Sequence, residues 1–161
     1  METQSLQIRF AQREDCGLIL EFIRGLAEYE HMSDEVTATE TILEEWIFDK
    51  KKAEVLIGEV DHKPVGFALF FHNFSTFLGK AGIYLEDLYV YPEYRGHGYG
   101  KKILKELAKI TVERDCGRLE WCCLDWNSPS IAFYKSLGAV SMDEWTTYRM
   151  TGKTLTDFVK Y

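Results

Sequence analysis

A glycine-rich turn carries the residues best suited to binding a charged ligand. It reads Arg95-Gly96-His97-Gly98-Tyr99-Gly100-Lys101 and lies between a predicted strand and a predicted helix. Glycines let the backbone approach a ligand closely, and the free N–H groups at a helix start favour an anion. Arg95 and Lys101 would add charge-assisted hydrogen bonds. The turn therefore predicts a binding site for phosphate groups.

Two common nucleotide-binding motifs do not fit this turn. A Walker loop needs glycine where the chain has Arg95, and serine or threonine where it has Lys102. A dinucleotide fingerprint needs G-x-G-x-x-G, whereas the spacing from Gly96 to Gly100 is G-x-G-x-G. A glycine-rich turn that merely starts a helix is the remaining alternative to phosphate binding.

Two carboxylates interrupt the apolar strand that precedes the turn. Glu86 and Asp87 lie within the predicted strand 83–90. Burial would raise the pKa of Glu86 and make it a better proton acceptor near neutral pH, so it is the candidate general base. A carboxylate that is paired or turned to solvent is the alternative. Asp87 and Glu30 are candidates for binding a cationic group of a substrate, with solvated surface acids as the alternative.

Hydrophobic periodicity predicts the elements that position these residues. The predicted strands are 6–10, 54–60, 64–71, 83–90, 118–124 and 145–150, with a hairpin turn at Asp61-His62. The predicted helices are 14–30, 39–48 with Thr39 as N-cap, 98–113, a helix with Ser128 as N-cap that ends at Gly138, and 154–160. This order predicts an α/β fold, of the α+β kind with a mixed sheet, in which the two strands around the helix 98–113 are parallel neighbours.

Composition indicates a single globular domain over residues 1–161. The chain is 46% hydrophobic and 28% charged, and its formal charge of −7 disfavours nucleic acid as a partner. No apolar run approaches the ~20 residues of a membrane span, and Met1–Gln7 is polar, so we expect a cytosolic protein without a membrane partner. The four cysteines show no C-x-x-C spacing, which predicts reduced, mostly buried thiols and no metal site.

Several segments in order resemble the GNAT family of N-acetyltransferases. Arg95-x-x-Gly98-x-Gly100 matches the family motif R/Q-x-x-G-x-G/A. The wider chain is similar to the diamine (spermidine/spermine) and thialysine acetyltransferase branch. The matching segments are Leu26-Ala27-Glu28-Tyr29-Glu30, Tyr84-Leu85-Glu86-Asp87-Leu88-Tyr89-Val90, Asp125-Trp126-Asn127, Phe133-Tyr134-Lys135 and Leu137-Gly138-Ala139.

The resemblance implies a fold and a role for each site residue. It implies a central mixed, twisted sheet of about six or seven strands flanked by about four helices, with acetyl-CoA as co-substrate. Residues 95–101 would hold the pyrophosphate of coenzyme A. Backbone groups of a bulged strand at Leu88, Tyr89 and Val90 would face the acetyl group and the pantetheine arm. Asn127 would bond that arm, Glu86 would act through an ordered water, and Tyr134 would protonate the departing sulfur; a core aromatic is the alternative for Tyr134.

The expected reaction is direct transfer of an acetyl group to a primary amine in a ternary complex. Because an amine has a pKa near ~10.4, a base must first remove a proton. A diamine, a polyamine or a thialysine-like amino acid is the expected acceptor, and the resemblance implies a homodimer. Ser75-Thr76-Phe77 stands where the polyamine enzymes carry a tryptophan, so the amine itself stays open. A peptide or protein amine, and a non-catalytic CoA-binding regulator, are the alternatives.

Overall fold

The computed structural model describes residues 5–160, so part of the polar segment Met1–Gln7 lies outside it. The chain forms two compact units that meet in sequence between Cys122 and Cys123. Each unit is described by itself below. The single domain expected for residues 1–161 stays a prediction.

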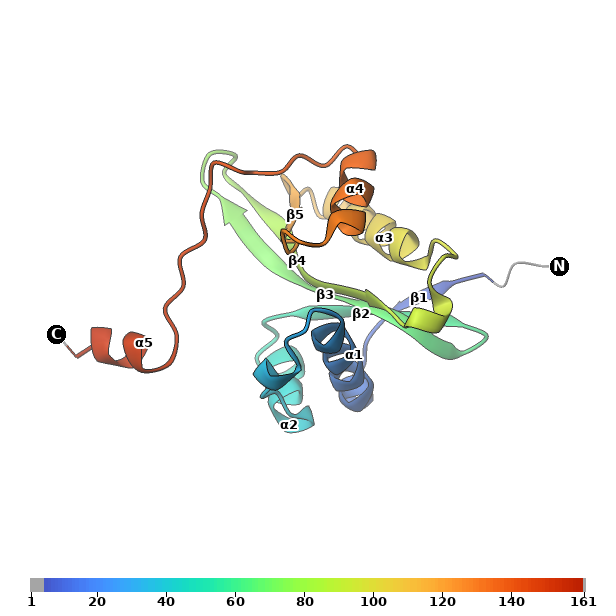
Figure 1. The fold of residues 1–161 in the computed structure, drawn as a ribbon, viewed down its shortest axis with the longest axis horizontal. Helices are drawn as coiled ribbons and strands as arrows, with labels where there is room; N and C mark the ends of the chain where they lie inside the picture. The colour runs from blue at the N-terminus through green and yellow to red at the C-terminus, as the bar shows by residue number, and fades with distance from the viewer. Residues whose placement is uncertain (1–4, 161) are drawn as a thin grey trace. The chain divides into compact units, whose positions relative to one another are not determined.

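The first unit is built on a mixed sheet with the strand order β1-β2-β3-β4-β5 (Figure 1). The strands are β1 Gln7–Phe10, β2 Glu54–Val60, β3 Lys63–Ser75, β4 Lys80–Val90 and β5 Leu119–Trp121. Neighbours from β1 to β4 are antiparallel, and β5 is parallel to β4, as predicted for the crossover connection. Asp61 and His62 both have positive φ, 50° and 63°, which confirms the tight hairpin between β2 and β3.

Helices cover both faces of this sheet. On one face lie α1, Cys16–Tyr29, and α2, Glu40–Leu43, which continues as a π-helix over Glu44–Asp49; on the other lies α3, Tyr99–Glu113 (Figure 1). Phe22 of α1 is fully buried and stacks on Phe67 of β3, with 5.0 Å between ring centroids. The hydroxyl of Thr39 accepts a hydrogen bond from the Ile42 N–H, 3.2 Å away, which confirms the predicted cap.

The second unit contains two helices, α4, Ser128–Ser136, and α5, Gly152–Phe158. The predicted N-cap Ser128 is wrong by one residue, because the Asn127 side chain accepts the bond from the Ser130 N–H and Ser128 is already helical. Gly138 ends the α4 segment with φ of 88°, as expected of a left-handed terminating residue.

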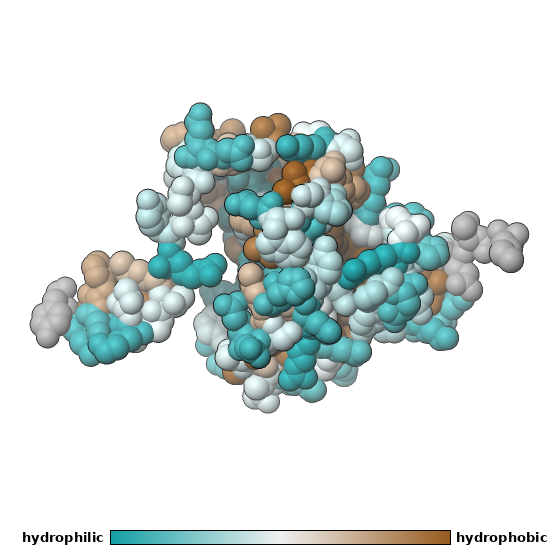
Figure 2. Space-filling view, in the orientation of Figure 1, coloured by the Kyte–Doolittle hydropathy of each residue, from teal (hydrophilic) through white to brown (hydrophobic). Residues whose placement is uncertain are grey.

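The fold class is confirmed, while the number of strands is lower than predicted. Residues 5–160 form five strands instead of six or seven. The predicted strand 145–150 is not formed, because a strand needs a hydrogen-bonded partner and the second unit contributes only helices and turns. β5 also ends at Trp121, short of the predicted 124. On the face visible in Figure 2, hydrophilic residues lie over much of the surface.

Candidate active site

A β-bulge in β4 lies at the centre of the candidate site. Leu69 of β3 pairs with Asp87, and the next residue, Phe70, pairs with Leu85, so Glu86 is an extra residue without a partner on β3. An extra residue bends the strand and interrupts its hydrogen-bond ladder. The bulged strand implied by the resemblance is therefore present, and Glu86 is its extra residue.

The bulge changes which backbone groups face the open side of β4. Before the bulge, the Ile83 N–H points toward β5 and donates to the Arg118 carbonyl, 2.9 Å away. After it, the Tyr91 N–H points toward β3 and donates to the Val65 carbonyl, also 2.9 Å away. Because backbone groups alternate along a strand, the N–H groups of Leu88 and Val90 point away from β3.

No strand among residues 5–160 covers this side of β4 beyond Leu85. The last register pair between β4 and β5 joins Leu85 to Trp121. The N–H groups of Leu88 and Val90 therefore open onto an edge where a ligand can accept hydrogen bonds. The Tyr89 N–H points toward β3, as that of Tyr91 does, and the Tyr89 ring is buried and packs near Phe22, with 6.4 Å between ring centroids.

The expectation that Glu86 is buried is wrong. Its side chain is exposed, because the bulge turns it out of the regular alternation of buried residues in β4. Asp87, the next residue, is half-buried. Burial is the largest cause, and together with the negative charges of Glu86 and Glu30 it raises the pKa of Asp87 to about 7.

Glu30 completes a group of three carboxylates, which we call the acidic group: Glu30, Glu86 and Asp87. Glu30 follows the last residue of α1 and is half-buried. Burial raises the pKa of Glu30, and so does the charge of Glu86. The three predicted substrate-binding acids therefore lie within electrostatic range of one another. Among the ion pairs of residues 5–160, none neutralises the acidic group.

The glycine-rich turn has the backbone expected of an anion-binding loop. Gly96 and Gly98 have φ of 83° and 77°, the left-handed region that favours glycine. A Cβ added at either would meet no atom within 4 Å, so open space lies beside both residues. Gly98 caps α3, and the N–H groups of Tyr99, Gly100 and Lys101 form its first turn. This open loop with unpaired helix-start donors fits a diphosphate.

Two side chains of the turn, those of Arg95 and His97, contact other groups of the protein. The Arg95 Nε donates to the Val90 carbonyl, 3.1 Å away, and the guanidinium lies over the rings of Tyr29 and Tyr89. The His97 ring contacts the carbonyls of Tyr94 and Arg95 through Nδ1, at 3.2 and 3.1 Å. Lys101, like Arg95, is exposed.

Tyr99 is directed into the protein rather than toward a ligand. Its ring is buried with Val60 and Val65 and stacks on His97, with 5.4 Å between centroids. Only the backbone of Tyr99 can therefore contact a phosphate group at the start of α3.

Asn127 and Tyr134 belong to the second unit. Asn127 is buried and uses its side-chain oxygen to cap α4. Tyr134 is half-buried on α4, with its ring centroid 5.6 Å from that of Phe133. Its carbonyl accepts the Ala139 N–H, 3.2 Å away, at the end of the helix.

Two features of the site were not predicted from the sequence. One is the raised pKa of Asp87, which cannot be predicted from the alternation of β4 before the position of the bulge is known. The other is Cys122, which is exposed, whereas only Cys16 of the four free cysteines is buried. The expectation of mostly buried thiols is therefore wrong, because β5 ends before Cys122.

A depression of about 570 Å³ lies elsewhere on the first unit and is lined by none of the predicted site residues; Phe10, Phe48 and Phe71 are among its walls. Within residues 5–160, no group of three or more His, Cys, Asp or Glu side chains could hold a metal ion. The described helices are all too short or too polar to cross a membrane.

Comparison with known proteins identifies the class. The sequence pattern of the acetyltransferase (GNAT) family matches residues 19–139. The chain is 39% identical to the thialysine N-epsilon-acetyltransferase of Bos taurus, over 93% of this chain and 95% of that protein. It is 36% identical to the spermidine/spermine N(1)-acetyltransferase-like protein 1 of Homo sapiens, over 94% of this chain and 23% of that protein.

A solved structure, an integron cassette protein from the mobile metagenome of V. cholerae, superposes with a TM-score of 0.81 at 28% identity, covering 99% of this chain and all of that one. The chain belongs to the acetyltransferase (GNAT) family. It is an acetyltransferase enzyme of the GNAT type, whose members use acetyl-CoA as co-substrate.

Proposed function

We propose that this enzyme transfers the acetyl group of acetyl-CoA to a primary amine of a small cationic molecule, either a thialysine-like amino acid or a diamine or polyamine. The observation that carries the proposal is the acidic group beside the bulge of β4. Three carboxylates that form no ion pair with any cation of residues 5–160 attract a molecule with more than one ammonium group. The similarity to a thialysine acetyltransferase and to a spermidine/spermine acetyltransferase-like protein supports the same class of acceptor.

Two backbone sites would hold acetyl-CoA, which supplies an acetyl group activated as a thioester. The open loop at Gly96 and Gly98, with the N–H groups that start α3, binds the diphosphate, and Lys101 adds a positive charge. The outward N–H groups of Leu88 and Val90 bind the pantetheine arm and the acetyl oxygen. Donors fixed where negative charge develops lower the barrier to acyl transfer.

Proton removal is assigned to the exposed carboxylate of the bulge. Glu86 is open to solvent and takes the proton of the attacking ammonium through a water molecule. Asp87 and Glu30 hold the second cationic group of the acceptor. A cation bound there stabilises the ionised form of Asp87, so acceptor binding below pH 7 is accompanied by release of a proton from Asp87.

Residues of the second unit complete the proposed reaction. Tyr134 donates its phenolic proton to the departing sulfur, and Asn127 bonds the pantetheine arm. Both assignments rest on the resemblance of the segments 125–127 and 133–135 to the family. A homodimer, a cytosolic location and a single domain stay predictions.

An amine panel tests the proposal. Thialysine, ornithine, 1,3-diaminopropane, spermidine and a peptide with a free N-terminus are each offered with acetyl-CoA, and release of the coenzyme thiol is measured. A dicationic small molecule should have the highest kcat/KM. Preference for the peptide would assign a protein amine, and no thiol release with any amine would leave a CoA-binding regulator.

A matched pair of variants then tests the role of the acidic group. Glu30→Gln should raise KM for the preferred dicationic amine about tenfold, because one charge partner is lost. Glu28→Gln removes an exposed carboxylate from the last turn of the same helix and should leave KM unchanged. Equal effects of the two changes would mean that only overall charge attracts the amine.

A further inference from the structure

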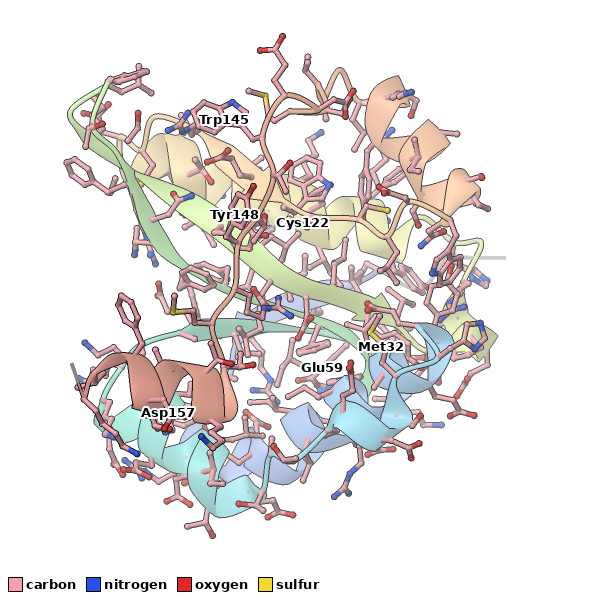
Figure 3. The ribbon with its side chains drawn as sticks, turned by 60° about the vertical axis from the view of Figure 1, so that its left-hand side comes forward. Met32, Glu59, Cys122, Trp145, Tyr148 and Asp157 are labelled. Atoms are coloured by element: carbon pink, nitrogen blue, oxygen red, sulfur yellow. The ribbon has the colours of Figure 1, made fainter. Side chains whose placement is uncertain are left out.

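Tyr84 and Cys122 join β4 to β5 at the point where the two strands part. The Tyr84 hydroxyl donates a hydrogen bond to the Cys122 Sγ, 2.8 Å away. Cys122, labelled in Figure 3, directly follows the last residue of β5. The last register pair of the two strands is Leu85 with Trp121, so the bond lies at the final step of their ladder.

The ladder that this bond extends is short. β5 has three residues, and three register pairs connect it to β4. Short edge ladders open easily, since few hydrogen bonds hold their ends. A side-chain bond at the last step opposes such opening where the bulge begins, because Glu86 is the residue that follows Leu85.

The surroundings of Tyr84 keep its hydroxyl as a donor. Its half-buried ring packs against Phe71, with 5.3 Å between centroids. Burial raises the pKa of Tyr84, and the bond to Cys122 and the charges of Cys122, Glu86 and Glu120 raise it further. The hydroxyl is therefore protonated at all physiological pH values, and it lies within electrostatic range of the proposed base Glu86.

We propose that Tyr84 and Cys122 are positioning residues, which tie β4 to β5 so that Glu86 and the outward N–H groups of Leu88 and Val90 keep a fixed geometry for acetyl transfer. This inference rests on the proposed function. Neither residue touches the reacting atoms in this role. The tie acts through the bulge, so its loss should affect kcat more than KM for the amine.

Three variants test the tie. Tyr84→Phe removes the donor and keeps the ring, Cys122→Ala removes the acceptor, and Cys122→Ser restores a hydroxyl acceptor. Tyr84→Phe and Cys122→Ala should each lower kcat about three- to tenfold, the range of one hydrogen bond. The double variant should be no slower than either single variant, because both remove the same bond. Cys122→Ser should keep most of the wild-type kcat.

Matched controls separate this effect from general damage. Cys116→Ala removes another thiol of the first unit, and Tyr148→Phe removes the hydroxyl of a tyrosine that is 91% exposed. Both should keep the wild-type kcat. Hydrogen exchange provides a readout besides activity: the amide of Leu85, which points toward β5 as that of Ile83 does, should exchange faster in Tyr84→Phe and Cys122→Ala than in Cys122→Ser.

Alkylation of the folded wild-type enzyme avoids any failure of a variant to fold. Iodoacetamide should modify the exposed Cys122 and lower kcat, whereas Cys122→Ser treated in the same way should keep its activity. Unchanged kcat in Tyr84→Phe and Cys122→Ala, or effects that multiply in the double variant, would overturn the tie. Failure of the wild-type enzyme to release thiol with any amine would instead contradict the proposed function.

Discussion

The guanidinium of Arg95 lies over the ring of Tyr29, with its central carbon 5.0 Å from the ring centroid. Tyr29 is the last residue of α1, and Glu30 of the acidic group follows it. Arg95 begins the glycine-rich turn and also bonds the Val90 carbonyl. One side chain therefore connects the proposed diphosphate site, the bulged strand and the proposed amine site.

Arg95→Lys should weaken the binding of both acetyl-CoA and the amine. Lysine keeps the charge but loses the planar group that stacks on the ring, a contact of about 1 kcal/mol, so KM for each substrate should rise roughly fivefold. Initial-rate kinetics with each substrate varied in turn measure this. Arg24→Lys, an exposed position on α1, is the control. A change confined to acetyl-CoA would limit Arg95 to the phosphate site.

Asp87→Asn should stabilise the free enzyme at high pH. Asp87 keeps its proton to about pH 7 when folded, whereas an unperturbed aspartate releases it near 3.8. The folded state therefore binds more protons between these values, so the wild-type free energy of unfolding falls as pH rises through that window and levels off above it. At pH 8 the free energy of unfolding of the variant should exceed that of the wild type by roughly 1–2 kcal/mol, and its unfolding temperature should be a few degrees higher. Near pH 4 the two proteins should not differ.

The same substitution should impair acceptor binding. Without the carboxylate, KM for the amine should rise at pH 8, and the weakening of wild-type binding below pH 7 should disappear. Thermal unfolding and KM, both measured from pH 4 to 9, check the two effects. A wild-type KM that is constant through pH 7 would contradict the role of Asp87.

Glu86→Gln should shift the pH optimum of kcat upward. Without the proposed base, the reaction depends on the small fraction of amine that is already neutral, and this fraction grows tenfold for each pH unit. The pH–rate profile with saturating substrates measures the shift. An unaltered profile would mean that another group, or water alone, takes the proton.

Alanine should have different effects at two glycines of the turn. Gly98→Ala forces a side chain into the left-handed region and should cost about 1–2 kcal/mol of stability. Gly100→Ala lies in the first turn of α3, where the new Cβ would meet only Val90 Cγ2 at 3.8 Å, so stability should be kept or raised. Gly98→Ala should bind coenzyme A more weakly by calorimetry, whereas Gly100→Ala should keep the wild-type affinity, because the family motif admits alanine at this position. Wild-type affinity in Gly98→Ala would move the diphosphate away from this turn.

Tyr134→Phe should lose most of the rate and keep coenzyme affinity. The ring still packs beside Phe133, while the proton for the departing sulfur is missing. Single-turnover rates and coenzyme binding distinguish the two effects. Unchanged turnover would remove Tyr134 from the mechanism and leave it as a packing residue of α4.

Much of the fold could be predicted because local patterns specify it. The alternation of β2 and β3, the turn at Asp61-His62 and the apolar stripe of α3 each depend on neighbours in sequence. The glycine-rich turn predicted between a strand and a helix is likewise present, with Gly96 and Gly98 at positive φ. The segment 145–150 has the alternation of a strand, but pairing requires a partner that sequence periodicity does not provide.

The candidate site was predicted less completely, for a physical reason. Nothing in the order Leu85-Glu86-Asp87-Leu88 shows which residue is the extra one, since the register with β3 decides this. Burial was therefore assigned to Glu86, whereas Asp87 is the half-buried carboxylate. The bond from Tyr84 to Cys122 is equally invisible, because it joins positions 38 residues apart.

Deletion of Glu86 alone would show how far the proposed chemistry depends on the register between β3 and β4. Removing the extra residue would let β4 pair evenly with β3, because Leu85 and Asp87 already oppose the neighbouring residues Phe70 and Leu69. The N–H groups of Leu88 and Val90 would still point away from β3. Such a deletion should yield a well-folded protein that is inactive, because it lacks the proposed base and the bend that the bulge gives to β4. The irregular pairing at Glu86 thus makes this edge of the sheet suitable for catalysis, at the expense of regular strand pairing.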